Sequence, residues 1–188
     1  REAQNVVELV SERMRKYEEA LWAGVAAIHA LGDEVSVDQW QVFASRLNLG
    51  QRYPGINGIG VIDFLPRDER AAYLQLHQQQ RPGFSIYPEH ERDVLFPIRL
   101  IEPLDKNRKA LGLDIAHESN RFNAAMLARD TGRAQITGPI VLVQDEASTP
   151  GFLFYAPYYR SSAVAAGEQP SDLSLIHISE PTRPSQIA

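Results

Sequence analysis

Residues 7–31 read VELVSERMRKYEEALWAGVAAIHAL, and this stretch decides the first part of the fold. Its small and apolar positions recur at alternating intervals of three and four residues: Val7, Val10, Met14, Tyr17, Leu21, Gly24, Ile28 and Leu31. This heptad spacing predicts a long helix with one packing seam. Gly32 predicts its end, because glycine tolerates the positive φ of a helix C-terminus. Two interpretations stay open: a stalk that dimerises, or an amphipathic helix packed on its own domain.

Short helix and strand patterns follow this first helix. Ser36 and Gln39 form a capping box, which predicts a short helix through Leu47. Further along, β-branched runs bounded by Gly and Pro predict strands, among them residues 111–115. We count about six strands and about four helices, with consecutive strands near the end that favour antiparallel pairing. The predicted fold class is α+β.

Composition and motifs exclude several classes of function. The chain has 188 residues, with 19 Lys and Arg against 24 Asp and Glu, so its formal charge is -5 and no nucleic-acid partner is predicted. The absence of cysteine excludes disulfides and thiolate sites, and the five histidines lack metal-binding spacing. No nucleophile elbow and no phosphate-binding loop are present. We therefore predict no metal, no cofactor and no enzyme activity for this segment.

Both ends of the chain carry unusual features. Residue 1 is Arg, and we expect the chain to start inside a longer open reading frame. From Leu173 the sequence LSLIHISEPTR resembles one reading frame of a transposase-type sequencing adapter. We therefore expect residues 173–188 to be a tail that is not native and that packs weakly. The alternative is a short strand from Leu175 to Ile178.

Two segments combine polar side chains with apolar runs. Asp93 precedes an apolar run and is placed to accept hydrogen bonds from a ligand, while Thr137 offers a hydroxyl beside the Gly138-Pro139 kink. Such polar groups between apolar walls are typical of a small-molecule pocket. In the structural alternative, Asp93 pairs with a neighbouring base and Thr137 satisfies its own turn. The candidate walls are Ile98, Leu113, Ile140 and Val143.

A series of short motifs lies in order between residues 50 and 160. They are Tyr53-Pro54-Gly55-Ile56, Gly58-Ile59-Gly60, Arg92-Asp93-x-x-Phe96-Pro97-Ile98, Ile101-Glu102-Pro103, Leu111-Gly112-Leu113-Asp114, Ala128-Arg129-Asp130-Thr131-Gly132, Gly138-Pro139-Ile140 and Gly151-Phe152-x-x-Tyr155-x-Pro157-x-Tyr159. This ordered set resembles CHASE domains, the extracytoplasmic sensor domains of receptor histidine kinases, nucleotide cyclases and diguanylate cyclases. The resemblance implies a long stalk helix followed by two PAS-like antiparallel-sheet lobes, with membrane-spanning helices on either side in the full protein.

The resemblance also implies a division of the chain and a function. Residues 1–49 are expected to form the stalk and a short helix, and residues 50–172 the sensor region with an incomplete second lobe, while the adapter resemblance sets residues 173–188 apart as the tail. The expected function is a periplasmic small-ligand sensor of a transmembrane receptor, coupled to a cytoplasmic output domain and dimerised through the stalk. The alternatives are a ligand-free dimerisation or interaction module and a soluble PAS-like binder.

Candidate binding residues follow from plant cytokinin receptors, which carry this domain and bind adenine-type hormones in the distal lobe. Asp93 corresponds to the acidic residue that meets the purine, and Leu113 to a position that offers backbone contacts. Thr137 is similar to a threonine on which the hormone response depends, while Ile140 and Val143 match apolar wall positions. Val141 departs from the pattern, because plant members have a basic residue there. The implied ligand is a small molecule, of adenine type in the plant members.

Overall fold

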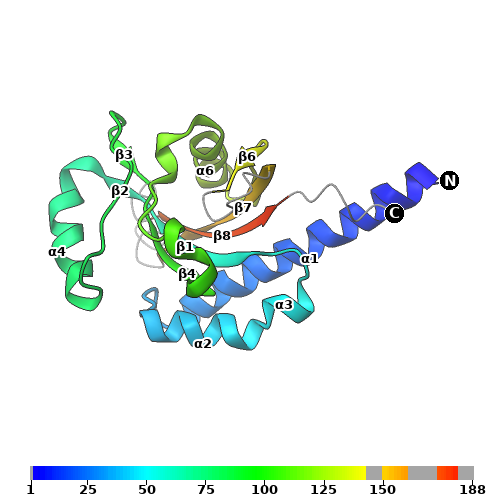
Figure 1. Ribbon diagram of the computed structural model, residues 1–188, viewed down its shortest axis with the longest axis horizontal. Helices are drawn as coiled ribbons and strands as arrows, with labels where there is room; N and C mark the ends of the chain where they lie inside the picture. Colours follow the sequence, from blue (N-terminus) through cyan, green and yellow to red (C-terminus); the bar gives the residue numbers. More distant parts are fainter. Residues whose placement is uncertain (1, 143–149, 161–172, 182–188) are drawn as a thin grey trace.

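The computed structural model describes residues 2–142, 150–160 and 173–181. The first helix, α1 (Glu2–Ala30), is long, and its N-terminal part extends beyond the body of the protein (Figure 1). Gly32 has a φ of 84°, in agreement with its predicted role after the helix. The capping box of Ser36 and Gln39 is present and starts α2 (Val37–Leu47). A short helix, α3 (Leu49–Arg52), follows.

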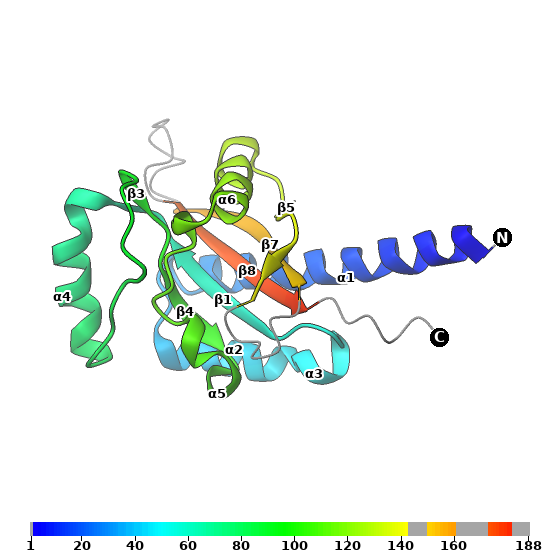
Figure 2. The same cartoon turned by 45° about the horizontal axis from the view of Figure 1, so that its top comes forward.

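Six strands form one antiparallel sheet with the order β4-β1-β8-β7-β5, in which β6 also pairs with β7. Figure 2 shows the main strands side by side. The strands are β1 (Gly58–Asp63), β4 (Ile98–Glu102), β5 (Gln135–Ile136), β6 (Ile140–Val141), β7 (Pro150–Tyr159) and β8 (Leu173–Pro181). Two shorter strands, β2 (Leu65–Pro66) and β3 (Val94–Leu95), pair separately. The predicted α+β class is confirmed, while the two PAS-like lobes stay a prediction.

The prediction of a weakly packed tail is wrong for residues 174–179. Strand β8 lies between β1 and β7 and pairs with both. Leu175, Ile176 and Ile178 are buried, and they contribute to the apolar clusters on the two faces of the sheet. The physical reason is that a short apolar strand gains backbone hydrogen bonds on both edges when it fills a central position. The adapter resemblance itself is a matter of sequence and stays a prediction.

Helices cover the two faces of this sheet, and Figure 1 shows the sheet between them. α1 and α2 pack on one face, which we call the α1 face, around Tyr17, Leu21 and Trp40. On the other, the α6 face, α6 (Ser119–Thr131) packs over Phe96 and Tyr155. The remaining helical elements are α4 (Arg70–Gln80), α5 (Leu104–Asn107) and 3-10 turns at Arg67–Glu69, Arg108–Ala110 and Ile115–His117.

The heptad seam of α1 divides into two parts. Its C-terminal part, including Leu21 and Ile28, is buried against the sheet of its own domain. Its N-terminal part is open to solvent, with Val7 63% and Val10 53% exposed. The interpretation of a helix packed on its own domain is therefore confirmed for the C-terminal part, while the dimerising stalk stays a prediction for the N-terminal part. None of the helices in the described part of the chain has both the length and the apolar character needed to cross a membrane.

The predicted strand at residues 111–115 is wrong. Gly112 has a φ of 78°, which takes the backbone out of the extended region. Asp114 then accepts the backbone N–H of Ala116 with its side chain and begins the 3-10 turn Ile115–His117. Only isolated bridges remain, from Leu113 to Tyr87 and from Asp114 to Pro97. Local side-chain capping has replaced the strand.

Candidate functional site

The helix α6 places a cation inside the protein. The carboxylate of Glu118 accepts the backbone N–H groups of Asn120 at 2.8 Å and Arg121 at 3.0 Å, which caps the helix. From this start, the buried side chains of α6 are Arg121 and three alanines, Ala124, Ala125 and Ala128. They share one helix face, because residues three and four apart are neighbours on a helix. Arg121 therefore points to the interior with the alanines, and it is only 4% exposed.

Arg121 is only partly satisfied where it lies. Its Nη2 donates to the Val141 carbonyl at 2.7 Å, while its buried Nε has no hydrogen-bond partner. None of the ion pairs found among the described residues involves Arg121. Burial lowers the pKa of Arg121, but an arginine side chain keeps its proton in proteins. The α6 face thus contains a buried positive charge that forms no ion pair with an acidic side chain in the described part of the chain.

Tyr155 of β7 contributes a second polar group to the same face. Its ring is fully buried, and its hydroxyl has no hydrogen-bond partner. Burial raises the pKa of Tyr155, and the nearby charge of Arg121 acts in the opposite direction. Arg121 and Tyr155 therefore influence each other electrostatically, as a cation and a neutral hydroxyl.

His177 of β8 lies next to Tyr155. It pairs in register with Tyr155 on one side and Gly60 on the other, so the positions share a face of the sheet. Gly60 leaves room for the imidazole, since a Cβ atom there would lie 2.3 Å from His177 Nε2. Neither ring nitrogen has a partner, and burial lowers the pKa of His177 to about 3. The imidazole is neutral at pH 7.

Two of the five predicted binding residues belong to this region. Leu113 and Ile140 are buried in the same apolar cluster as Tyr155. The backbone of Leu113 is engaged within the protein, because its N–H donates to the Ala110 carbonyl at 3.1 Å and its carbonyl accepts from Ile98 at 2.9 Å. Leu113 and Ile140 can thus form apolar walls. Val143 lies outside the described residues.

The other two predicted residues have different surroundings. Asp93 is exposed, and its backbone carbonyl accepts the N–H of Arg67 at 2.8 Å, next to the pairing of β2 with β3. Thr137 is buried, and its hydroxyl accepts the backbone N–H of Leu153 at 2.9 Å. The Thr137 N–H donates in turn to the Leu153 carbonyl at 2.9 Å. Thr137 therefore joins the segment after β5 to β7 rather than satisfying its own turn.

A hydrogen bond between a histidine and a buried aspartate, which the sequence did not reveal, holds the loop before β3. His90 Nε2 lies 2.7 Å from Asp114 Oδ2, and Asp114 Oδ1 accepts backbone N–H groups from Phe96 at 2.8 Å and Ala116 at 3.0 Å. His90 Nδ1 accepts the backbone N–H of Arg92 at 3.1 Å, which assigns the ring proton to Nε2. The two residues are 24 positions apart, so no local spacing indicates the pair.

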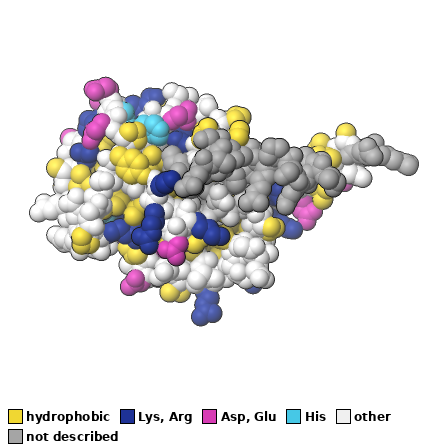
Figure 3. Space-filling model, in the orientation of Figure 1, with side chains coloured by type: hydrophobic (Ala, Val, Ile, Leu, Met, Phe, Trp, Pro, Cys, Tyr) yellow, Lys and Arg dark blue, Asp and Glu magenta, His cyan; other side chains and the backbone are white. Residues whose placement is uncertain are grey.

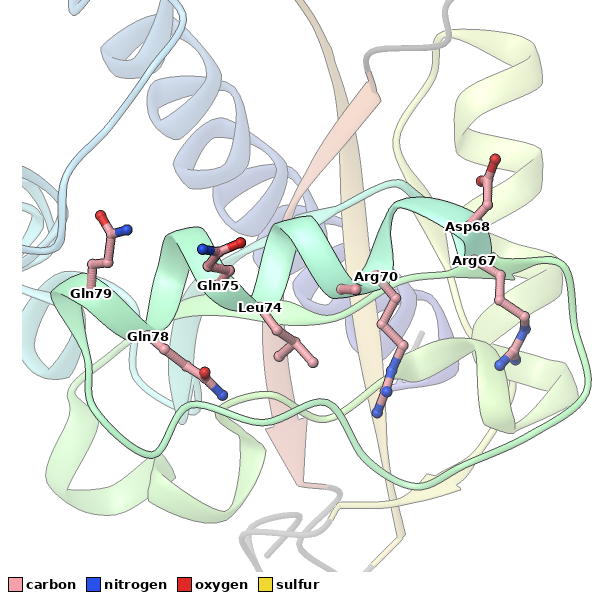
Figure 4. Close-up of a pocket in the computed structure, with 8 residues that line it drawn as sticks. Arg67, Asp68, Arg70, Leu74, Gln75, Gln78 and Gln79 are labelled. Carbon is pink, nitrogen blue, oxygen red and sulfur yellow. The ribbon is translucent and has the colours of Figure 1, made fainter.

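An open groove of about 650 Å³ runs along α4 and was also not predicted. Figure 4 shows Arg70, Leu74 and Gln78 pointing to one side of the helix and Gln75 and Gln79 to the other. The basic group of Arg70 is already engaged, since it lies 2.6 Å from the carboxylate of Glu89. α4 itself has no buried residue. The groove is therefore shallow, and the α6 face is the stronger candidate for a binding site.

Metal binding has no structural support in the part of the chain that the structure describes. No three side chains of His, Asp or Glu there lie close enough to hold an ion. On the face drawn in Figure 3, acidic and basic side chains are interspersed rather than gathered by sign. The polar groups of the α6 face, by contrast, are hydrogen-bond donors and acceptors beside an apolar cluster, as in sites for small organic molecules.

Comparison with known proteins identifies the family. The family model of the CHASE domain matches residues 33–175, which is most of the chain. A search of curated proteins finds no match. The match confirms the resemblance seen in the motifs between residues 50 and 160. The chain belongs to the CHASE family, whose members are extracytoplasmic, non-catalytic sensor domains of signalling receptors.

Proposed function

We propose that this chain senses a small ligand in the periplasm, binds it between α6 and the six-stranded sheet, and transmits binding through α1 to an output domain. The observation that carries the proposal is the presence of two partly satisfied polar groups on the α6 face, Arg121 and Tyr155. Tyr155 is buried in one cluster with Leu113 and Ile140, and Arg121 is buried on the same side of α6 as three alanines, all of which belong to this cluster. An unmet buried donor costs about 1–3 kcal/mol, and more when charged. Such a cost is typical of sites where a ligand supplies the missing partner.

The arrangement of β7 supports transmission to α1. Tyr155 belongs to the cluster on the α6 face, while its neighbours Phe154 and Ala156 belong to the cluster on the α1 face. Successive side chains of a strand point to opposite faces, so a shift of Tyr155 also moves the surface on which α1 packs. A ligand biases such an arrangement only through its different affinities for the two states.

Methyl NMR on the intact chain tests ligand binding directly. The probes are benzoate, benzyl alcohol and adenine, and the reporters are the methyl groups of Leu113 and Ile140. Ile136, which is 47% exposed, is the control reporter. We expect at least one probe to shift Leu113 and Ile140 without shifting Ile136. If none of the three shifts the two buried reporters, ligand binding on the α6 face is contradicted.

A second candidate function rests on the exposed part of α1. Val6, Val7, Leu9 and Val10 are between 44% and 66% exposed on the part of α1 that extends from the body. An apolar stripe with heptad spacing can dimerise with a copy of itself. We therefore retain the predicted homodimer, with flanking membrane helices and two PAS-like lobes in the full receptor, as part of the proposal.

Sedimentation equilibrium tests the dimer. A double Val7→Glu and Val10→Glu variant places charges on the stripe and is expected to weaken self-association at least tenfold. Val42→Glu on α2, where Val42 is 60% exposed, is the matched control and should leave association unchanged. If the wild-type chain is monomeric at all concentrations, or the double variant associates equally well, the dimer through α1 is contradicted.

A further inference from the structure

The unmet groups on the α6 face define the chemistry of a ligand, and this inference rests on the proposed function. Arg121 Nε is a charged donor, and the Tyr155 hydroxyl both donates and accepts. Arg121 is held in place by its bond to the Val141 carbonyl, so its remaining donors have a fixed direction. Charge and donor type together favour an anionic acceptor over a cation.

The electrostatic setting makes the preference for an anion stronger. A buried charge without a partner is costly, because it loses its hydration and the apolar interior offers no equally favourable interaction. The charge of Glu118 acts on Arg121, but the oxygens of this carboxylate accept two backbone N–H groups at the start of α6. An anion beside Arg121 would neutralise the positive charge that the described acidic side chains leave uncompensated.

We infer that the α6 face binds a small organic carboxylate, with one carboxylate accepting hydrogen bonds from Arg121 Nε and the Tyr155 hydroxyl and its apolar part lying against Leu113 and Ile140. A carboxylate has two oxygens with about four acceptor positions, enough for both donors at once. Charge-assisted bonds of this kind are about twice as strong as neutral ones. The apolar walls favour an aromatic or aliphatic acid over a sugar acid.

The packing of α6 indicates how such a ligand enters. Besides Arg121, the buried side chains of the helix are alanines, while the half-buried Phe122 and Met126 pack against the same apolar cluster of the sheet. An acid that reaches Arg121 Nε between α6 and β7 therefore has to displace part of this contact.

Isothermal titration of the intact chain tests the inference with benzoate, benzyl alcohol and adenine. The decisive variant is Tyr155→Phe, which removes one donor and keeps the ring. Tyr158→Phe is the matched control, because Tyr158 lies on the same strand but in the cluster of the α1 face. Arg121→Lys keeps the positive charge and removes the Nε donor.

We expect benzoate to bind the wild-type chain at least tenfold more tightly than benzyl alcohol. Tyr155→Phe and Arg121→Lys should each weaken benzoate binding about tenfold, and Tyr158→Phe should have no effect. If benzyl alcohol or adenine binds as well as benzoate, or Tyr155→Phe leaves benzoate affinity unchanged, the carboxylate assignment is overturned while ligand sensing survives. If no probe binds by titration or shifts Leu113 and Ile140 in NMR, both proposals fail.

Discussion

The two helices that cover the sheet are held by different kinds of side chain. α1 places Tyr17, Leu21 and Ile28 into its cluster, and the Tyr17 hydroxyl donates to the Pro54 carbonyl at 3.0 Å. α6 places three alanines into the opposite cluster, with Phe122 and Met126 half-buried against it, and its buried Arg121 keeps an unpaired Nε. Truncating large buried side chains costs several kcal/mol, and an unmet buried donor costs about 1–3 kcal/mol. The difference indicates that α1 anchors the domain, and it is the reason why the proposed binding site lies beside α6 and not beside α1.

Truncation on the α1 face should have the largest effect on stability. Trp40 is buried, and its indole Nε1 donates to the Ile59 carbonyl at 3.3 Å. Trp40→Ala is expected to lower the free energy of unfolding by about 3–5 kcal/mol, because a large cavity replaces the ring. Urea unfolding followed by circular dichroism measures the loss.

Trp22→Ala provides the matched control for Trp40→Ala. Trp22 lies on α1, is 37% exposed and bonds to Glu18 on the same helix. Its replacement should cost less than about 1 kcal/mol. Equal losses for Trp22→Ala and Trp40→Ala would contradict the view that the α1 face anchors the sheet.

Low pH should destabilise the protein through His177, which lies on the α6 face of the sheet. Burial lowers its folded pKa to about 3 against an ordinary value of 6.5, so between these values only the unfolded chain takes up the proton. Stability therefore falls as the pH drops through this window, by about 1.4 kcal/mol per pH unit from this residue, and is unaffected above it. Chemical unfolding of wild type and His177→Leu at several pH values measures the difference.

His177→Leu removes the titrating group and keeps a side chain of similar size. Replacing unmet polar atoms by apolar ones is nearly neutral or stabilising, so the variant should match or exceed wild type at pH 7. Its advantage should grow as the pH falls from 6.5 towards 4. An identical pH dependence in the two proteins would show that β8 does not bury His177 as described.

Two substitutions at Thr137 test whether this residue stabilises the fold or binds the ligand. Its hydroxyl accepts the Leu153 N–H, so Thr137→Val leaves a buried donor unpaired and should cost about 1–3 kcal/mol. Thr137→Ser keeps the hydroxyl and should recover most of that stability. Thermal unfolding compares the three proteins. If Thr137→Val is as stable as the wild type but no longer binds benzoate, Thr137 belongs to the binding site instead.

The smallest changes in the free energy of unfolding are expected when the hydroxyl of Tyr155 or of Tyr17 is removed. Tyr155→Phe removes a hydroxyl without a partner, and its free energy of unfolding should stay within about 0.5 kcal/mol of wild type or rise. Tyr17→Phe removes a hydroxyl bonded to the Pro54 carbonyl and should cost about 1 kcal/mol. Urea unfolding resolves the two. A larger loss for Tyr155→Phe than for Tyr17→Phe would show that the Tyr155 hydroxyl already has a partner.

Local features were predictable from sequence because short-range physics controls them. The heptad spacing predicts the long helix, Gly32 its end, and Ser36 with Gln39 the next start, as the structure confirms. The ordered motifs also predict the CHASE family, which the family match confirms. By contrast, the strand predicted at residues 111–115 failed because Gly112 and the capping side chain of Asp114 prevent an extended run.

The candidate site was predictable only in part, for a similar reason. Leu113 and Ile140 were assigned as apolar walls and by motif, and both are buried on the α6 face, while their role in binding stays a prediction. Asp93 was assigned by motif, but its side chain is exposed beside the pairing of β2 with β3. Arg121 was not singled out, because a charged residue on a helix is exposed by default and only its neighbours reveal its burial.

The sequence by itself determined the α+β class, the long first helix and the CHASE family, since periodicity, caps and ordered motifs are written along the chain. Only the tertiary structure decided which half of the α1 seam is buried and that β8 fills the centre of the sheet. It also brought Arg121, Tyr155 and His177 to one face from three separate elements. The physical reason is that the cost of an unpaired polar atom depends on what the whole fold packs around it, which no single stretch of sequence contains.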